Sequence, residues 1–238
     1  MGGVVLEMAG SHGFPDSRLD WRGRQAMLER ISRAGGRASL DDLDRLVFTP
    51  WRRAYKQREE TGQEASWTGF LDRLRRTAGC QIEDLVLLEA WFEPYGEQLQ
   101  PVAGAAAALH ELSAAGYRLG LVSNVPLPGE LYLGVLRRHG IASVFGVTVF
   151  SYDVHSRKPS PALLRQAMAV LASRPESTVM VGDRRERDVA AGRSAGIATV
   201  WIRSADSPGP RADAELESLA GLPGLLGEWG DRIADHGD

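Results

Sequence analysis

The chain lacks several features that would place it in a functional class at once. Its 238 residues include one cysteine, Cys80, which excludes an intramolecular disulfide and a zinc site built from several cysteines. Its net charge is only −3, so it has no strongly basic field of the kind that binds nucleic acid. No stretch approaches the roughly 18 apolar residues of a membrane-spanning helix, and residues 1–10 do not resemble a signal peptide. We therefore expect a cytoplasmic protein with no nucleic-acid or membrane partner.

Lysine is the other scarce residue. Only Lys56 and Lys158 occur, against 26 arginines. A lysine can lose its proton and form a Schiff base, which arginine cannot readily do, so each lysine is a candidate for chemistry. Hydrophobic residues make up 43% of the chain and charged residues 25%, which is the composition of an ordinary globular protein with a sizeable core.

The hydrophobic pattern changes twice along the chain. A short β-branched run at Val4-Val5-Leu6 predicts a buried strand. The next part is helical, with apolar periods over residues 19–34, 40–60, 64–78 and 82–92. Further along, predicted helices (103–115, 129–138, 161–172 and 187–195) alternate with predicted strands (119–123, 147–150, 178–181 and 199–202). Two closing helices are expected over residues 213–220 and 222–234.

This alternation predicts the fold class. The strands are continuous apolar runs, which are typical of a parallel sheet that is covered on both faces. The order indicates an α/β fold whose doubly wound parallel-sheet (Rossmann-like) core carries an inserted all-helical cap domain. We expect the core domain to comprise residues 1–14 and 98–238, and the cap to comprise residues 15–97. Pro94, Gly96 and Pro101 are expected to interrupt the chain and to mark a hinge or a boundary between the two domains.

Polar residues follow the predicted strands at the edge where open α/β sheets bind ligands. The first strand leads into Glu7-Met8-Ala9-Gly10-Ser11, the second ends at Ser123-Asn124, and the fourth leads into Gly182-Asp183. Lys158 precedes a core helix, and Asp188 follows Asp183 by five residues. Carboxylates, a hydroxyl, an amide and an ammonium at one edge suit a Mg²⁺ site beside a phosphate.

In this order and spacing, the residues resemble the haloacid dehalogenase superfamily, in the branch with a helical cap after its first motif. Leu121-Val122-Ser123-Asn124 resembles motif two, Arg157-Lys158-Pro159 resembles motif three, and residues 181–188 resemble motif four. The resemblance implies that Ser123 and Asn124 bind the phosphoryl group and that Lys158 neutralises its charge. It also implies that Asp183 binds Mg²⁺, while Asp188 orders the loop or holds Lys158.

Motif one departs from the family pattern Asp-x-Asp-Gly-Thr. Glu7 stands at the nucleophile position and is one methylene longer than aspartate, and Ala9 replaces the general acid/base. Ser11 still offers a hydroxyl for phosphate, and the Ala9 carbonyl and Glu7 remain possible Mg²⁺ ligands. Losing a general acid/base costs about 10²–10⁴-fold in rate, and a misplacement of about 1 Å costs about 10²-fold. An efficient phosphatase is therefore not expected.

Three functions remain open at this point. The first is a Mg²⁺-dependent, phosphatase-type hydrolase with impaired or altered catalysis on a small phosphate or other anionic substrate. The second is a protein that keeps the fold for ligand binding or regulation without catalysis. The third is a phosphonatase-like or dehalogenase-like hydrolase, in which Lys56 would supply the Schiff base of the phosphonatase branch. The sequence leaves the substrate and the oligomeric state open.

Overall fold

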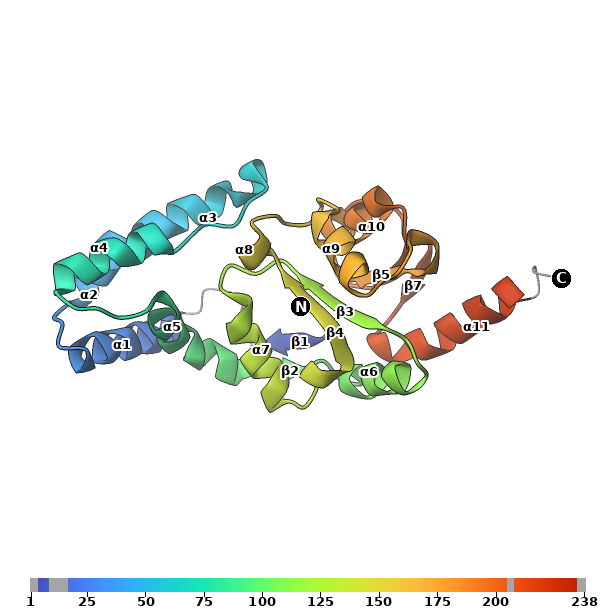
Figure 1. Cartoon of the computed structure of the whole chain (residues 1–238), viewed down its shortest axis with the longest axis horizontal. Coiled ribbons are helices and arrows are strands. Elements are labelled where there is room, and N and C mark those ends of the chain that lie inside the picture. The colour runs from blue at the N-terminus through green and yellow to red at the C-terminus, as the bar shows by residue number, and fades with distance from the viewer. Residues whose placement is uncertain (1–3, 9–16, 205–207, 235–238) are drawn as a thin grey trace.

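The computed structural model describes residues 4–8, 17–204 and 208–234. Every element that it assigns between residues 17 and 98 is helical, as the periodicity predicts. These helices gather at one end of the molecule (Figure 1): α1 (Ser17–Arg33), α2 (Leu40–Leu43), α3 (Thr49–Thr61), α4 (Thr68–Ala78) and α5 (Asp84–Gln98). A π-helical turn, Asp44–Phe48, joins α2 to α3. None of the helices in the described part of the chain could span a membrane.

Local sequence signals explain where these helices begin and end. Ser39 and Asp42 form a capping box at the start of α2, in which each side chain binds the other residue's backbone N–H. Gly62 and Gly79 end α3 and α4 in the left-handed conformation that glycine adopts without strain. The helices enclose an aromatic cluster whose largest members are fully buried: Phe48, Trp67, Trp91 and Tyr95.

Strands and helices alternate in the rest of the described chain, and most lie within a few residues of their expected positions. The strands are β1 (Leu6–Met8), β2 (Leu99–Pro101), β3 (Leu119–Ser123), β4 (Phe145–Phe150), β5 (Val179–Gly182), β6 (Ala198–Ile202) and β7 (Ala214–Leu216). The helices are α6 (Ala105–Ala114), α7 (Gly129–Arg138), α8 (Ser151–Val154), α9 (Ala162–Val170), α10 (Ala190–Ala195) and α11 (Leu222–Ala234).

Parallel pairing dominates the strands that carry the predicted site. β3 pairs with β4 in parallel, so that Ser123 lies beside Phe150 at their carboxyl ends. β5, β6 and β7 form a second parallel ladder in which Gly182 lies beside Trp201. The structure thus confirms an α/β fold with parallel sheets and helical crossovers.

Three expectations about local structure are wrong. β1 pairs antiparallel with β2, a strand that the sequence did not predict, so β1 does not enter the parallel ladders of the described chain. Pro94 and Gly96 do not interrupt the regular structure, because both lie buried within α5, which continues to Gln98. The predicted helix over residues 213–220 contains β7 instead, since pairing with β6 outweighs the weak helical period of that segment.

Candidate active site

The first group of site residues surrounds the end of β3. Ser123 is the last residue of that strand, and its side chain is fully buried. The amide of Asn124 forms two hydrogen bonds with the backbone of Lys158: Nδ2 donates to the carbonyl oxygen, and Oδ1 accepts from the N–H, both at 2.9 Å. Segments 34 residues apart in the sequence are thereby joined at one edge of the sheet, as the strand ends predict.

Lys158 is the buried cation of this site. Its Nζ lies 2.6 Å from Oδ1 of Asp188 and donates to the carbonyl oxygen of Val122 at 3.0 Å. The side chains of Lys158 and Asp188 are 8% and 7% exposed. An ammonium group has three donors, and these two partners within the described chain account for two of them.

The turn after β5 places Asp188 against Lys158. The backbone N–H of Arg184 donates to Oδ2 of Asp188 at 3.0 Å, which closes the turn. A Cβ on Gly182 would lie 2.2 Å from the Cβ of Asp188, so glycine is needed at that position. Burial opposes the charged form of Asp188, but the Lys158 ammonium and the Arg184 N–H outweigh it and hold the pKa of Asp188 below its usual value.

The pKa of Asp183 is shifted in the opposite direction from that of Asp188. Burial raises the pKa of its carboxyl group, and the negative charge of Asp188 raises it further. Its backbone carbonyl accepts from Nε1 of Trp201 at 3.0 Å and from Oγ of Ser204 at 2.7 Å, so the main chain at this position is fixed. A buried carboxylate beside a second negative charge is an oxygen donor that a divalent cation would stabilise, and this donor chemistry fits Mg²⁺.

Of motif one, the structure describes only Glu7 and Met8. Glu7 is exposed on β1, and the described structure contains no hydrogen bond or ion pair between it and Asn124, Lys158 or Asp183. Ala9 and Ser11 lie outside the described residues. Within the described chain, no group of three or more histidine, cysteine or carboxylate side chains is close enough to hold a metal ion. The structure therefore joins Asn124, Lys158 and Asp188 through direct contacts and places Asp183 beside Asp188, whereas Glu7 makes no hydrogen bond or ion pair with them in the described chain.

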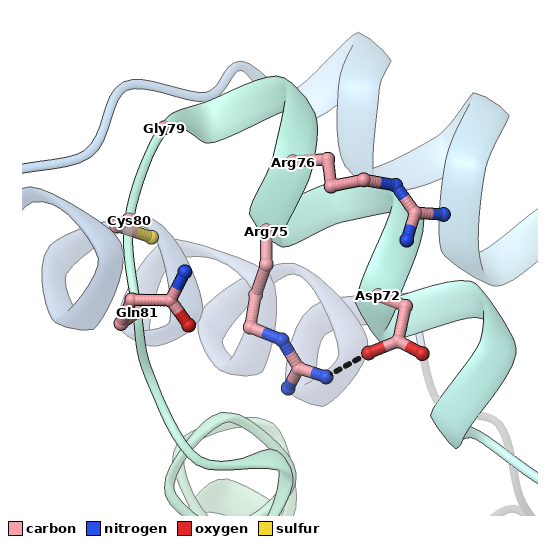
Figure 2. A pocket seen from close by; sticks show the side chains of 6 residues that line it. All are labelled: Asp72, Arg75, Arg76, Gly79, Cys80 and Gln81. Atoms are coloured by element: carbon pink, nitrogen blue, oxygen red, sulfur yellow. Dashed lines mark hydrogen bonds and ion pairs between the residues drawn. The ribbon is translucent and has the colours of Figure 1, made fainter.

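One cavity and Lys56 are further candidate features in the described chain. A cavity of about 480 Å³ opens in the helical region, lined by Asp72, Arg75, Arg76, Gly79, Cys80 and Gln81 (Figure 2). It contains none of the predicted site residues, and Arg75 is neutralised by Asp72 and Asp84. Lys56 is exposed on α3, which agrees with a solvated helix face.

Sequence reasoning missed several residues that support the site. Glu64 and Ser151 are buried polar residues that contact each other beside the end of β3. Trp201 reaches Asp183 across the ladder. No motif marks any of these residues. The periodicity places Glu64 at the start of the expected helix over residues 64–78, where an acidic residue is common and gives no sign of a buried contact.

The fold is α/β with parallel ladders, and Asn124, Lys158 and Asp188 lie in contact beside the end of β3. A family model described as haloacid dehalogenase-like hydrolase matches residues 41–202, and the chain belongs to that family. The matched range contains Ser123, Asn124, Lys158, Asp183 and Asp188, and it begins after motif one.

Three similar proteins illustrate this relationship. A phosphoserine phosphatase from Thermus thermophilus is 31% identical over 87% of this chain and 83% of its own length. A ribulose-1,5-bisphosphate 5-phosphatase from Halopiger xanaduensis is 28% identical over 90% of this chain and 94% of its own length. The crystal structure of a phosphatase of this family from Thermococcus onnurineus covers 95% of both chains with a TM-score of 0.58 at 24% identity, and this likeness shows the fold.

Proposed function

We propose that the chain is a Mg²⁺-dependent hydrolase of small phosphate esters that has kept its anion site and has impaired catalysis. The observation that carries this proposal is the buried Lys158 ammonium, held 2.6 Å from Asp188 at the carboxyl end of β3. The similar phosphoserine and ribulose-bisphosphate phosphatases support a small phosphorylated substrate. Burying an ion pair is costly unless its geometry is well satisfied, which favours a functional reason for this one.

In this proposal, four residues bind the phosphoryl group. Ser123, Asn124 and Ser11 offer hydroxyl and amide groups to its oxygens. The free proton of the Lys158 ammonium donates to the same group and neutralises its charge. Asp188 acts through Lys158, because it fixes the direction of the ammonium group.

The proposed Mg²⁺ ligands are Asp183, the Ala9 carbonyl and Glu7. When bound, the ion would neutralise negative charge on the phosphate and the attacking carboxylate. Isothermal titration of Mg²⁺ into wild type and Asp183→Asn tests the assignment. We expect the substitution to abolish measurable binding, whereas equal binding by both proteins would remove Asp183 as a ligand.

Motif one limits the rate in this proposal. In-line attack needs a carboxylate oxygen about 3–3.5 Å from phosphorus, and Glu7 projects one methylene too far from the same backbone position. Ala9 cannot protonate the leaving oxygen or activate water afterwards. We expect hydrolysis of a generic phosphate ester to be very slow or absent. A wild-type rate of about 1 s⁻¹ or faster that Glu7→Gln abolishes would show that Glu7 is a working nucleophile.

The helical segment completes the proposal. We assign residues 15–97 to a cap domain and residues 1–14 and 98–238 to the core. The supporting observation is that all elements of the described segment 17–98 are helices grouped at one end of the molecule (Figure 1). A cap at the ligand-binding edge would exclude water from the anion site.

A second candidate function is ligand binding or regulation without catalysis. The exposure of Glu7 on a strand outside the parallel ladders favours it. Trapping of a covalent phosphoryl adduct on Glu7, read by mass spectrometry, discriminates between the two. An adduct supports the hydrolase, whereas phosphate binding with neither adduct nor turnover supports the binding protein.

A further inference from the structure

The loop between α3 and α4 makes direct contact with the loops of the proposed anion site. We call residues 62–67 the docking loop. Trp67, its last residue, is fully buried, and its Nε1 donates to the carbonyl oxygen of Pro126 at 2.8 Å. Pro126 lies two residues after Asn124. The docking loop is therefore anchored on the segment that follows β3.

Glu64 is the charged residue of the docking loop. Its Oε1 accepts a hydrogen bond from Oγ of Ser151 at 2.8 Å and lies 3.7 Å from Nε of Arg157. The side chains of Glu64 and Arg157 are 3% and 4% exposed. A carboxylate buried this deeply is stable only with partners, and Ser151 and Arg157 are the partners that the described structure supplies.

Both partners of Glu64 lead to residues of the anion site. The Ser151 hydroxyl accepts from the backbone N–H of Val125 at 2.8 Å, and Val125 follows Asn124. Arg157 immediately precedes Lys158. Because Asn124 and Lys158 also bind each other, the docking loop and the two site segments form one closed set of contacts.

The hydroxyl of Ser151 makes this arrangement sensitive to Glu64. A hydroxyl has one proton to donate, and two acceptors are within reach: Oε1 of Glu64 at 2.8 Å and the carbonyl oxygen of Val125 at 3.2 Å. The shorter contact to the charged acceptor is the stronger one. Without the charge on Glu64, the proton would turn to Val125, and the docking loop would lose this hydrogen bond while keeping the one between Trp67 and Pro126.

We propose that Glu64 is a positioning residue. Through its contacts with Ser151 and Arg157, it couples the position of the docking loop to the positions of Asn124 and Lys158. This inference rests on the proposed function for the identity of the anion, but the coupling concerns the apoprotein as well. A carboxylate from the helical segment thereby influences a site to which it contributes no ligand.

Hydrogen exchange and phosphate binding on the full chain test this coupling. Glu64→Gln keeps the size of the side chain and removes its charge. We expect faster amide exchange in peptides covering residues 124–126 and 157–158, with β6 peptides unchanged. We also expect the Kd for inorganic phosphate to rise about tenfold. Gln63→Ala, at the exposed neighbouring position, is the matched control and should change neither measurement.

A double variant distinguishes an effect of Glu64 on the positions of the site residues from an effect on the stability of the fold. Glu64→Gln with Arg157→Gln removes both members of this buried ion pair, so the unfolding midpoint should lie closer to that of wild type than the midpoint of Glu64→Gln, which leaves Arg157 without the Glu64 charge. Phosphate binding should stay weak, since the hydrogen bond between the Glu64 carboxylate and Ser151 is still absent. Recovery of both quantities, or unchanged exchange in Glu64→Gln, would overturn the proposal. Absence of phosphate binding in wild type would instead contradict the proposed function, and the exchange measurement would still decide the coupling.

Discussion

The residues around the end of β3 and Glu7 of motif one differ in their burial and in the contacts that they make. Asn124, Lys158 and Asp188 are joined by contacts between 2.6 and 2.9 Å, and Lys158 and Asp188 are buried. Glu7 is exposed on a three-residue strand whose only ladder in the described chain is with β2. The first region is a network of buried and half-buried polar side chains, whereas Glu7 makes no hydrogen bond or ion pair with that network in the described chain.

This difference separates two tasks that phosphatases normally combine. Binding an anion needs a fixed cation and hydrogen-bond donors, which the buried network around Lys158 supplies. Transferring the phosphoryl group also needs a nucleophile and an acid/base at set distances, which Glu7 and Ala9 do not reproduce. The proposed function is that this chain keeps the first set and has lost the second.

The largest expected effect comes from restoring motif one. Glu7→Asp together with Ala9→Asp should raise the Mg²⁺-dependent rate on a phosphate ester by about 10⁴-fold or more, because it supplies a nucleophile of the right length and a proton donor. Either substitution alone should do much less, since residues that act as a unit are not additive. Steady-state kinetics of the four proteins measures this. An intact double variant without activity would place the defect elsewhere in the pocket.

The second-largest effect is expected from breaking the buried pair of Lys158 and Asp188. Lys158→Met leaves the Asp188 charge buried without its partner, so the free energy of unfolding should fall by about 3–5 kcal/mol, as denaturant titration measures. Arg137→Met is the control, because it breaks an exposed ion pair with Glu130 and should cost less than about 1 kcal/mol. Equal losses in both variants would show that the Lys158–Asp188 pair is not specially placed.

A smaller effect is expected from removing the hydrogen bond that joins the helical segment to the loop after β3. Trp67 stacks on Trp51 with ring centroids 4.2 Å apart and binds the Pro126 carbonyl. Trp67→Phe keeps much of the stacking and removes the donor, so unfolding should become easier by about 1–3 kcal/mol. Thermal unfolding measures this, with Trp21→Phe at an exposed position as the control. No difference between the two variants would mean that this anchor carries no stability.

The smallest effect is a pH dependence at β6. Hydrogen bonds from the Thr199 hydroxyl and N–H, at 2.7 and 2.8 Å, hold the pKa of Asp213 below its usual value. This contribution is present above the unfolded pKa of about 3.9 and is lost as the pH falls through the lower folded value. Asp213 is exposed, so Asp213→Asn should cost less than about 1 kcal/mol at pH 7 and less still near pH 3. Urea titration at both pH values checks this, and an equal cost would contradict it.

Local pattern was sufficient for much of the fold. The helix over residues 129–138 and the strand over 119–123 have the predicted bounds, because an apolar period and a terminal glycine or polar residue define each. β2 and β7 were missed because three-residue strands are defined by their partners, and pairing cannot be read from a short run.

The site was predictable only where a motif places residues at strand ends. Asn124, Lys158 and Asp188 lie together because parallel strands bring their carboxyl ends to one edge. The roles of Glu64 and Ser151 depend on contacts between segments 87 residues apart, and no spacing rule reports these. The conformation of Glu7 likewise depends on which strand its segment pairs with.

The central claim is that anion binding is intact while phosphoryl transfer is impaired. Titration of wild type with inorganic phosphate and Mg²⁺, followed by a turnover assay on the same sample, tests it most directly. We predict saturable phosphate binding that Lys158→Met abolishes, together with turnover far below 1 s⁻¹. Turnover of about 1 s⁻¹ or faster that is lost in Glu7→Gln, or absence of phosphate binding by the folded wild type, would contradict the account.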